Sequence, residues 1–199
     1  NLLVGFFVGL SSGATVIISQ YYGAQQDEQV SRAVHTAIAL AVAAGAVIMA
    51  VGLIFAPWAL GVIDTPADIM ENSIAYLRIY FVGMIPSLVY NMGAGILRAV
   101  GDSRRPLYFL ICGCLVNIVL DLLFVLVFRM GVEGAAIATI ISQAVSAVLI
   151  VFTLLRTDQS YRLFWRKIRF SWDMLRRIVT IGLPAGLQSV MYSFSVILI

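Results

Sequence analysis

The sequence predicts an all-α integral membrane protein, built as a polytopic helical bundle. Of the 199 residues, 61% are hydrophobic and 12% are charged, and the mean hydropathy is +0.99. Soluble domains carry about a quarter charged residues. Apolar stretches of about 20 residues, long enough to cross the hydrocarbon core as helices, alternate with short polar connections, and none shows the pattern of a membrane β-barrel strand. This composition excludes an ordinary soluble domain and a disordered chain.

We expect six membrane-spanning helices, because lipid-exposed backbone must satisfy its own hydrogen bonds. They cover residues 1–19, 35–60, 76–99, 107–128, 134–155 and 178–199. Both ends of the chain lie in apolar runs, and the start lacks the Met and the basic region of a signal peptide. We therefore expect a piece of a longer polytopic protein, with the remainder of that parent chain as its partner.

Lys and Arg residues define the expected sidedness. The connections around 20–34, 97–106 and 156–177 hold eleven of the 13 basic residues, and the alternate connections hold only Arg78 and Arg129. Cytoplasmic loops of membrane proteins are enriched in Lys and Arg. We expect these three connections in the cytoplasm, the helices in the cytoplasmic membrane, and membrane lipid as a partner. The net charge of +3 thus reflects topology and predicts no nucleic-acid partner.

The longest basic connection, 156–177, differs from the other two. Apolar residues recur in it at helical spacing, with basic residues between them: Tyr161, Phe164, Ile168, Trp172 and Leu175. This pattern predicts a basic amphipathic helix in the cytoplasmic headgroup layer. The alternative is a solvated basic linker. Under either interpretation the segment joins two parts of a larger protein.

One acidic residue, Asp121, lies inside a predicted span, whereas the other nine lie in connections or at span ends. A carboxylate at the bilayer centre costs about 2.5 to 3.5 kcal/mol on insertion scales, and such residues tend to mark ion or proton pathways. Removal from water also favours the protonated form of a carboxyl group, which suits a proton carrier. The alternative is an Asp121 that only holds helices together.

Asp121 shares a helix face with Asn117, and Thr139 and Gln143 share a face of the next span. A short turn near Met130 joins the two spans. Asp121 and Thr139 both lie nine residues from Met130, and Asn117 and Gln143 both lie thirteen. Each pair is therefore expected at a similar membrane depth, while the rotation of the helices stays open. A cluster of such oxygen donors suits H⁺ or Na⁺ and is a poor site for soft metals.

Small and polar residues mark the span 76–99. Asn91 belongs to a stripe of polar residues and glycines, and it is a candidate for lining a substrate path or for bonding to a neighbouring helix. Pro86 predicts a kink in mid-helix. In the first span, three glycines predict close packing against another helix: Gly5, Gly9 and Gly13.

The last span holds a second polar region. Pro184, Gly186 and Gln188 follow one another closely there. Discontinuous helices with such residues often mark transporter sites. We therefore expect a breakable helix, with Gln188 as a candidate for lining the substrate cavity.

We do not expect the protein to be an enzyme. The single histidine, His35, lies at a span boundary, and Cys112 and Cys114 point in different directions on a helix. A zinc site, a nucleophile with its base and a glycine-rich phosphate loop are not predicted, and no cofactor is expected.

Five motifs together resemble those of the multidrug and toxic compound extrusion (MATE) family, in particular its DinF-like branch. They are GATVIISQYYGAQQ at 13–26, GILRAVGDSRRPLYF at 95–109, NIVLD at 117–121, MGVEGAAIATIISQ at 130–143 and IGLPAGLQS at 181–189. Their order and spacing run through nearly the whole chain. Gln188 also resembles the DinF-like branch more than the branch with a Glu on the seventh helix.

The resemblance implies a secondary antiporter with two six-helix lobes that exports organic, often cationic compounds in exchange for H⁺ or Na⁺ as the coupling ion. Residues 1–155 would be the second to sixth helices of the N-terminal lobe. Residues 156–177 would be the inter-lobe linker, and 178–199 the truncated first helix of the C-terminal lobe. The family's first helix, which contributes another Asp to the cation site, is absent, so the fragment alone is not expected to transport.

The resemblance also implies roles for residues at matching positions. In the DinF-like branch an Asn and an Asp of the fifth helix and a Thr of the sixth form the cation-coupling network, and they match Asn117, Asp121 and Thr139. Gln143, Asn91 and Gln188 are the candidates for lining the substrate cavity.

Two alternatives stay open. The first is a flippase for lipid-linked oligosaccharides from the same superfamily, which we would expect to hold a pyrophosphate with several Arg or Lys in its cavity. The predicted spans have no central basic residue. The second is a non-transporting membrane scaffold in which Asp121 is structural.

Overall fold

The computed structural model describes residues 2–62, 66 and 69–198, and for 2–4, 6–7 and 193–198 the backbone alone. Throughout this part of the chain the regular structure is helical. Its elements are α1 (Leu2–Gly23), α2 (Asp27–Val62), α3 (Met70–Val82), α4 (Met84–Ala99), α5 (Arg104–Asp121), the π-helical turn η1 (Leu122–Val127), α6 (Gly131–Arg156), the short 3₁₀ turn η2 (Trp165–Lys167) and α7 (Trp172–Leu198). The predicted all-α class is confirmed.

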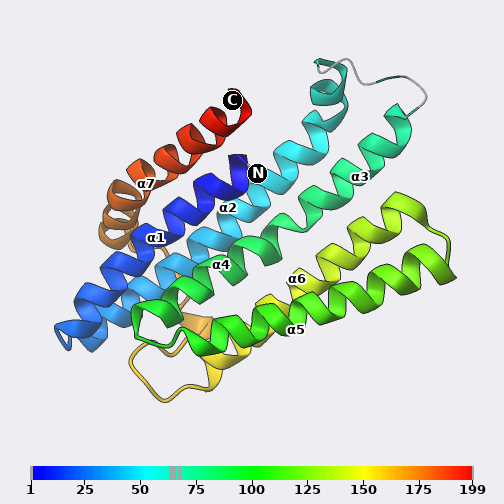
Figure 1. Ribbon diagram of the computed structural model, residues 1–199. Helices are drawn as coiled ribbons and strands as arrows, with labels where there is room; N and C mark the ends of the chain where they lie inside the picture. Colours follow the sequence, from blue (N-terminus) through cyan, green and yellow to red (C-terminus); the bar gives the residue numbers. More distant parts are fainter. Residues whose placement is uncertain (1, 63–65, 67–68, 199) are drawn as a thin grey trace.

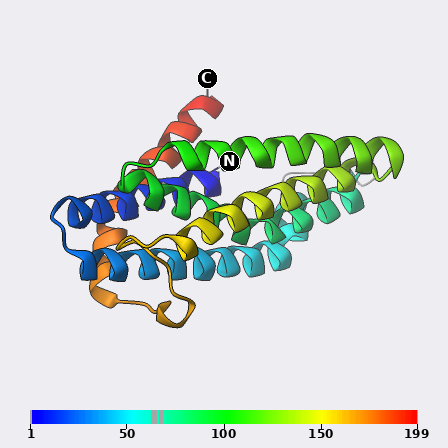
Figure 2. The ribbon, with the colours of Figure 1, turned by 90° about the horizontal axis from the view of Figure 1, so that it is seen from below.

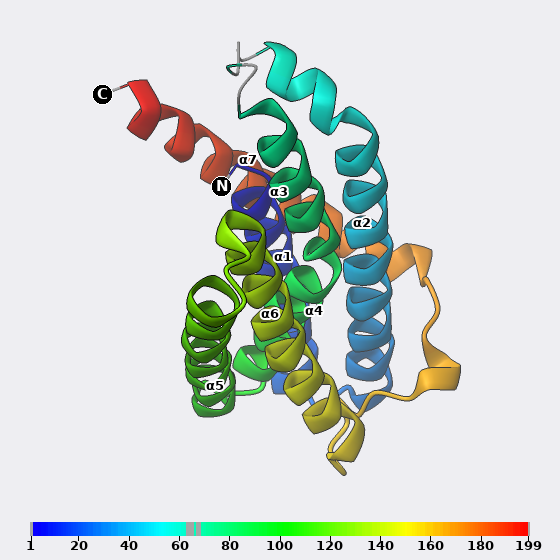
Figure 3. The same ribbon diagram turned by 90° about the vertical axis from the view of Figure 1, so that its right-hand side faces the viewer.

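The helices form one bundle in which consecutive long helices run in alternating directions (Figures 1 and 3). α1 packs against α7 and α4, α2 packs against α3 and α4, and α6 packs against α5, α4 and α3. The α1–α2 turn, the α4–α5 turn and the end of α6 lie at one end of the bundle, and the α5–α6 hairpin lies at the other (Figure 1). Figure 2 shows the bundle from below, with α5 and α6 side by side. This alternation agrees with the predicted sidedness.

Four helical stretches of the described chain are long and apolar enough to cross a membrane. They are residues 27–62, 70–99, 104–127 and 131–156, and they contain the second to fifth predicted spans except for residue 128. The first and sixth predicted spans lie on α1 and α7, apart from residues 1 and 199, which are outside the described residues. Both α2 and α7 begin earlier than predicted, at Asp27 and Trp172, because polar residues can extend a helix beyond the apolar run that the prediction follows.

The amphipathic helix predicted over 161–175 is wrong up to Ser171. Only the three residues of η2 are helical between Arg156 and Trp172. Tyr161 and Leu163 are buried, at 7% and 1% exposure, and the Leu163 N–H donates a 2.8 Å hydrogen bond to the Leu154 carbonyl of α6. Alternate residues pointing inward are typical of extended chain, so the helical spacing of the apolar residues is misleading here.

The predicted kink in the third span is confirmed, but it lies three residues before the proline. α3 ends at Val82 and α4 begins at Met84, and Gly83 donates its N–H to the Tyr80 carbonyl at 3.1 Å in a tight turn. Pro86 explains the position, because a proline ring clashes with the carbonyl of the residue four before it, here Val82.

The break predicted near Pro184 is wrong, since α7 continues through this residue. Instead, the glycines on either side of it pack against α1. A Cβ atom on Gly9 would meet the backbone of Gly186, and one on Gly13 would meet the backbone of Gly182. The close packing predicted for Gly9 and Gly13 is therefore confirmed, and that of Gly5 stays a prediction.

Candidate functional site

A polar cavity of about 380 Å³ lies between α4, α5 and α6. Its lining combines polar side chains with apolar surface, and none of the described lining residues is charged. The lining residues are Ser87, Tyr90, Asn91, Leu110, Gly113, Cys114, Asn117, Ser142, Gln143 and Ser146. Polar groups that converge on a cavity between membrane helices are typical of a ligand site.

Gly113 brings α5 and α6 into close contact at one side of this cavity. A Cβ atom at position 113 would collide with Ser146 Oγ and would lie 3.1 Å from the Ser142 carbonyl oxygen. The Ser146 hydroxyl donates a 3.1 Å hydrogen bond to the Phe109 carbonyl oxygen. The absence of a side chain at Gly113 thus permits the inter-helix hydrogen bond beside it.

The short turn between α5 and α6 determines how Asn117 and Gln143 align. η1 ends at Val127 and α6 begins at Gly131, whose φ of +59° is a left-handed conformation that glycine adopts without strain. Asn117 and Gln143 line the same cavity, in agreement with their predicted equal depth.

Asn117 and Asp121 lie one turn apart on α5, and each has a buried polar atom without a hydrogen-bond partner in the described structure. These atoms are Asn117 Nδ2 and Asp121 Oδ1. Leaving a buried polar atom unpaired costs about 1 to 3 kcal/mol, and native proteins keep few of them. The two are the only such side-chain atoms among the described residues, and they fall on the two α5 residues selected from the sequence.

The helix geometry changes immediately after Asp121. α5 ends at this residue, and η1 continues with the wider π-helical winding from Leu122 to Val127. π-helical turns inside α-helices are rare and frequently occur at functional sites. No pattern in the sequence indicates this change.

Thr139 lies on α6, and no hydrogen bond joins it to Asp121 in the part of the chain that the structure describes. Its hydroxyl donates a 2.9 Å hydrogen bond to the Ala135 carbonyl oxygen of the same helix. It lines a smaller cavity, of about 50 Å³, next to the break at Gly83. Ser87 and Gln143 line both cavities, so they lie between the two.

The other predicted cavity residues differ in position. Asn91 lines the polar cavity, and its Nδ2 donates a 2.8 Å hydrogen bond to the Ser87 carbonyl oxygen of its own helix. Its backbone carbonyl accepts a 3.0 Å hydrogen bond from Ser11 Oγ, which ties α1 to α4. Gln188 is exposed on α7 and lines neither of these cavities.

Tyr90 and Ser142 belong to the cavity wall and were not predicted. Tyr90 donates a 2.9 Å hydrogen bond from its hydroxyl to the Pro106 carbonyl oxygen, and so links α4 to the first turn of α5. Ser142 is buried on α6, one turn before Ser146. Its spacing of four residues from Ser146, which puts both on one helix face, is the signal that could have found it. Tyr90 carries no such signal, because tyrosines are common at membrane interfaces.

Four long apolar helices of the described chain, with a cavity of uncharged polar side chains between three helices of the bundle, define a polytopic helical membrane protein. The sequence model of the MatE family matches residues 1–123. The chain belongs to this family, which confirms the predicted membership.

Relatives and solved structures agree with this assignment. The chain is 30% identical to "Probable multidrug resistance protein YoeA" of Bacillus subtilis (strain 168), over 98% of this chain and 43% of that protein. It is 31% identical to "DNA damage-inducible protein F" of Escherichia coli (strain K12), over 67% of this chain and 29% of that one. The structure titled "Crystal structure of MATE in the bent conformation" matches with a TM-score of 0.90 and 27% identity, over 97% of this chain and 43% of that one. The chain thus spans less than half the length of each relative.

Proposed function

We propose that the protein is a secondary antiporter of the cell membrane that exports organic, often cationic small molecules in exchange for H⁺ or Na⁺. Family membership and the similarity to a probable multidrug resistance protein support small-molecule export. The identity of the coupling ion and the role of Asp121 go beyond those similarities, and they rest on the site itself.

The observation that carries the proposal is the pair of unpaired buried atoms at Asn117 and Asp121. A purely structural Asp would be expected to have a partner in the bundle, because satisfying it lowers the free energy of the fold. An acceptor oxygen kept without a partner favours a site that takes a ligand. A carboxylate oxygen in a desolvated place suits a proton or a hard cation.

Asp121 is proposed to carry the coupling ion. With H⁺, the carboxyl group is loaded by protonation and unloaded by deprotonation. With Na⁺, Asn117 can turn its amide oxygen toward the ion by rotation about χ2. The Thr139 hydroxyl donates its hydrogen bond to the Ala135 carbonyl oxygen. Its oxygen lone pairs therefore stay available for a cation. Loading drives transport only if the ion binds the outward- and inward-facing states with different affinity.

The polar cavity is proposed to contribute to the substrate path. Asn91, Gln143 and Ser87 give it hydrogen-bonding groups without a fixed charge, which suits varied organic cations. The flippase alternative receives no support here, because none of the residues that line this cavity is Lys or Arg, as a pyrophosphate would favour. Gln188 stays a candidate for lining this path, contributed by α7.

The experiment uses the full-length protein in proteoliposomes loaded with a fluorescent organic cation. Efflux is followed under an imposed pH gradient and then under a Na⁺ gradient, for wild type and Asp121→Asn. Asp158→Asn is the matched control, because its side chain is 91% exposed and pairs only with Arg162. We expect gradient-driven efflux in wild type and the control, and its loss in Asp121→Asn.

The outcomes separate the alternatives. The gradient that drives efflux identifies the coupling ion. Normal driven efflux in Asp121→Asn would make Asp121 structural, and absence of efflux from folded, correctly inserted wild type would favour the flippase or the scaffold.

A further inference from the structure

A second cavity, of about 530 Å³, lies between the start of α2 and the segment that joins α6 to α7. One wall is a turn of α2 that includes His35 and Thr36, and the other is formed by residues 166–171. We call it the basic pocket, because four cationic side chains line it and no carboxylate does. They are Arg32, Arg166, Lys167 and Arg169.

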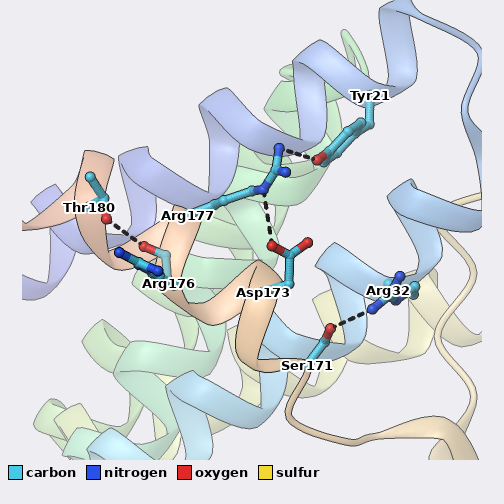
Figure 4. A network of polar contacts seen from close by, with 7 residues as sticks. All are labelled: Tyr21, Arg32, Ser171, Asp173, Arg176, Arg177 and Thr180. Carbon is cyan, nitrogen blue, oxygen red and sulfur yellow. Dashed lines mark hydrogen bonds and ion pairs between the residues drawn. The ribbon is translucent and has the colours of Figure 1, made fainter.

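Hydrogen bonds hold both walls of the basic pocket in place. Thr36 is fully buried, and its Oγ1 accepts a 3.3 Å hydrogen bond from the Ser171 N–H. Arg32 Nη2 donates a 2.9 Å hydrogen bond to Ser171 Oγ, and Figure 4 shows the two side chains pointing toward one another. On the other side, buried His35 accepts a 3.0 Å hydrogen bond at Nε2 from the Phe164 N–H. The segment is therefore fixed to α2 before and after the three cations that it contributes.

The charge of the basic pocket is not neutralised within the chain as described. None of the four cations forms an ion pair in the described part of the chain, where the ion pairs join Asp102 to Arg105, Asp158 to Arg162 and Asp173 to Arg177. Like charges gathered around one cavity repel one another. A bound anion with several oxygens relieves this repulsion, and Arg guanidinium groups match phosphate geometry well.

The surroundings of the pocket indicate where such a phosphate comes from. Trp165 and Trp172, which flank the three cations in the sequence, are 67% and 80% exposed, and Phe170 between them is also exposed. Exposed Trp next to basic residues is typical of the membrane–water interface, where clustered Lys and Arg bind anionic lipids. A pocket for a soluble phosphate compound would not need these exposed aromatic side chains.

We propose that the basic pocket binds the phosphate group of an anionic phospholipid headgroup. The site is distinct from the polar cavity between α4, α5 and α6, and the proposal does not depend on transport. The competing explanation is that the basic residues only set the topology of the chain. That explanation requires positive charge on this side of the membrane, but it does not require four cations around one cavity.

The test compares the full-length protein in nanodiscs of phosphatidylcholine alone and of phosphatidylcholine with added phosphatidylglycerol. The pocket variant is Arg166→Gln/Lys167→Gln/Arg169→Gln. The control variant removes three charges from the same predicted side, outside the pocket: Arg104→Gln/Arg156→Gln/Arg176→Gln. The readouts are the midpoint of thermal unfolding and the phosphatidylglycerol retained in native mass spectra.

We expect added phosphatidylglycerol to raise the unfolding midpoint of wild type and of the control, but not that of the pocket variant. Retained lipid should follow the same order, with about a tenfold loss of affinity for each cation–phosphate contact removed. Equal loss in both triple variants would overturn the proposal in favour of general surface charge. Should the pocket triple variant fail to insert, Lys167→Gln alone replaces it, and wild-type retention by that variant would overturn the proposal.

A further arm identifies the source of the phosphate. Wild type in phosphatidylcholine nanodiscs receives glycerol 3-phosphate or inorganic phosphate in solution. We expect neither to reproduce the stabilisation by phosphatidylglycerol. An equal stabilisation by either compound would identify a soluble phosphate ligand and would contradict the lipid assignment.

Discussion

His35 Nε2 accepts a 3.0 Å hydrogen bond from the backbone N–H of Phe164, which lies 129 positions later in the chain. On its other side, His35 Nδ1 lies 2.6 Å from the Ser31 carbonyl oxygen. A carbonyl oxygen only accepts, so Nδ1 carries the proton and Nε2 is free to accept. The two rings of His35 and Phe164 also stack, with their planes at 6°. This pair attaches the segment between α6 and α7 to α2.

Replacement of His35 by Ala is therefore expected to loosen that segment. The Phe164 N–H loses its partner, at a local cost of about 1 to 3 kcal/mol. Amide hydrogen exchange over residues 157–171 should become faster. His35→Gln, whose side-chain oxygen can take the place of Nε2, should retain more of the protection. Wild-type exchange in His35→Ala would show that the hydrogen bond does not hold the segment.

Gly113→Ala is expected to separate α5 from α6 beside the polar cavity. The new methyl group collides with Ser146 Oγ, and overpacking of this kind costs about 1 to 3 kcal/mol. Thermal unfolding in detergent measures the loss. Gly23→Ala is the control, because nothing lies within 4 Å of a Cβ atom there. The double variant Gly113→Ala/Ser146→Ala should recover part of the stability, and no recovery would argue against this contact.

Gly9→Ala is expected to destabilise the α1–α7 contact without a comparable rescue. The atoms that a Cβ would meet belong to the backbone of Ala185 and Gly186, so no side chain can be trimmed to make room. The unfolding midpoint should fall at least as far as in Gly113→Ala. A midpoint equal to that of Gly23→Ala would contradict the close approach of the two helices.

Asn117→Leu separates a functional role of the amide from a structural one. Because Nδ2 is buried without a partner, an apolar side chain of similar size should leave thermal stability unchanged or higher. The proposed coupling site should nevertheless be impaired, with driven efflux reduced. A large fall in the unfolding midpoint would instead indicate that the amide donates a structural hydrogen bond.

Helix positions and the hairpin register were predictable from the sequence, because they depend on local apolar runs and on a short turn. Asn117 and Gln143 face one cavity as the distance from Met130 implies. Helix rotation was not predictable, and Thr139 accordingly lines the neighbouring cavity. Tyr161 and Leu163 are buried in the core. Such tertiary contacts outweigh the helical spacing of the apolar residues, so the helix predicted for the inter-lobe segment does not form.

The basic pocket could not be predicted from spacing either. Arg32 lies near the start of the chain and the other three cations lie near its end, so only the path of the segment around α2 brings them together. The π-helical turn after Asp121 packs against α6, a contact that the spacing of apolar residues does not indicate.

The most direct test of the proposed coupling measures ion movement together with substrate movement. Proteoliposomes that contain the full-length protein are loaded with an organic cation, and the entry of H⁺ or Na⁺ that accompanies its exit is recorded. We expect substrate-dependent ion entry in wild type and in Asp158→Asn, and none above background in Asp121→Asn. Substrate-dependent ion entry at the wild-type rate in Asp121→Asn would contradict the assignment of Asp121 as the coupling carboxylate.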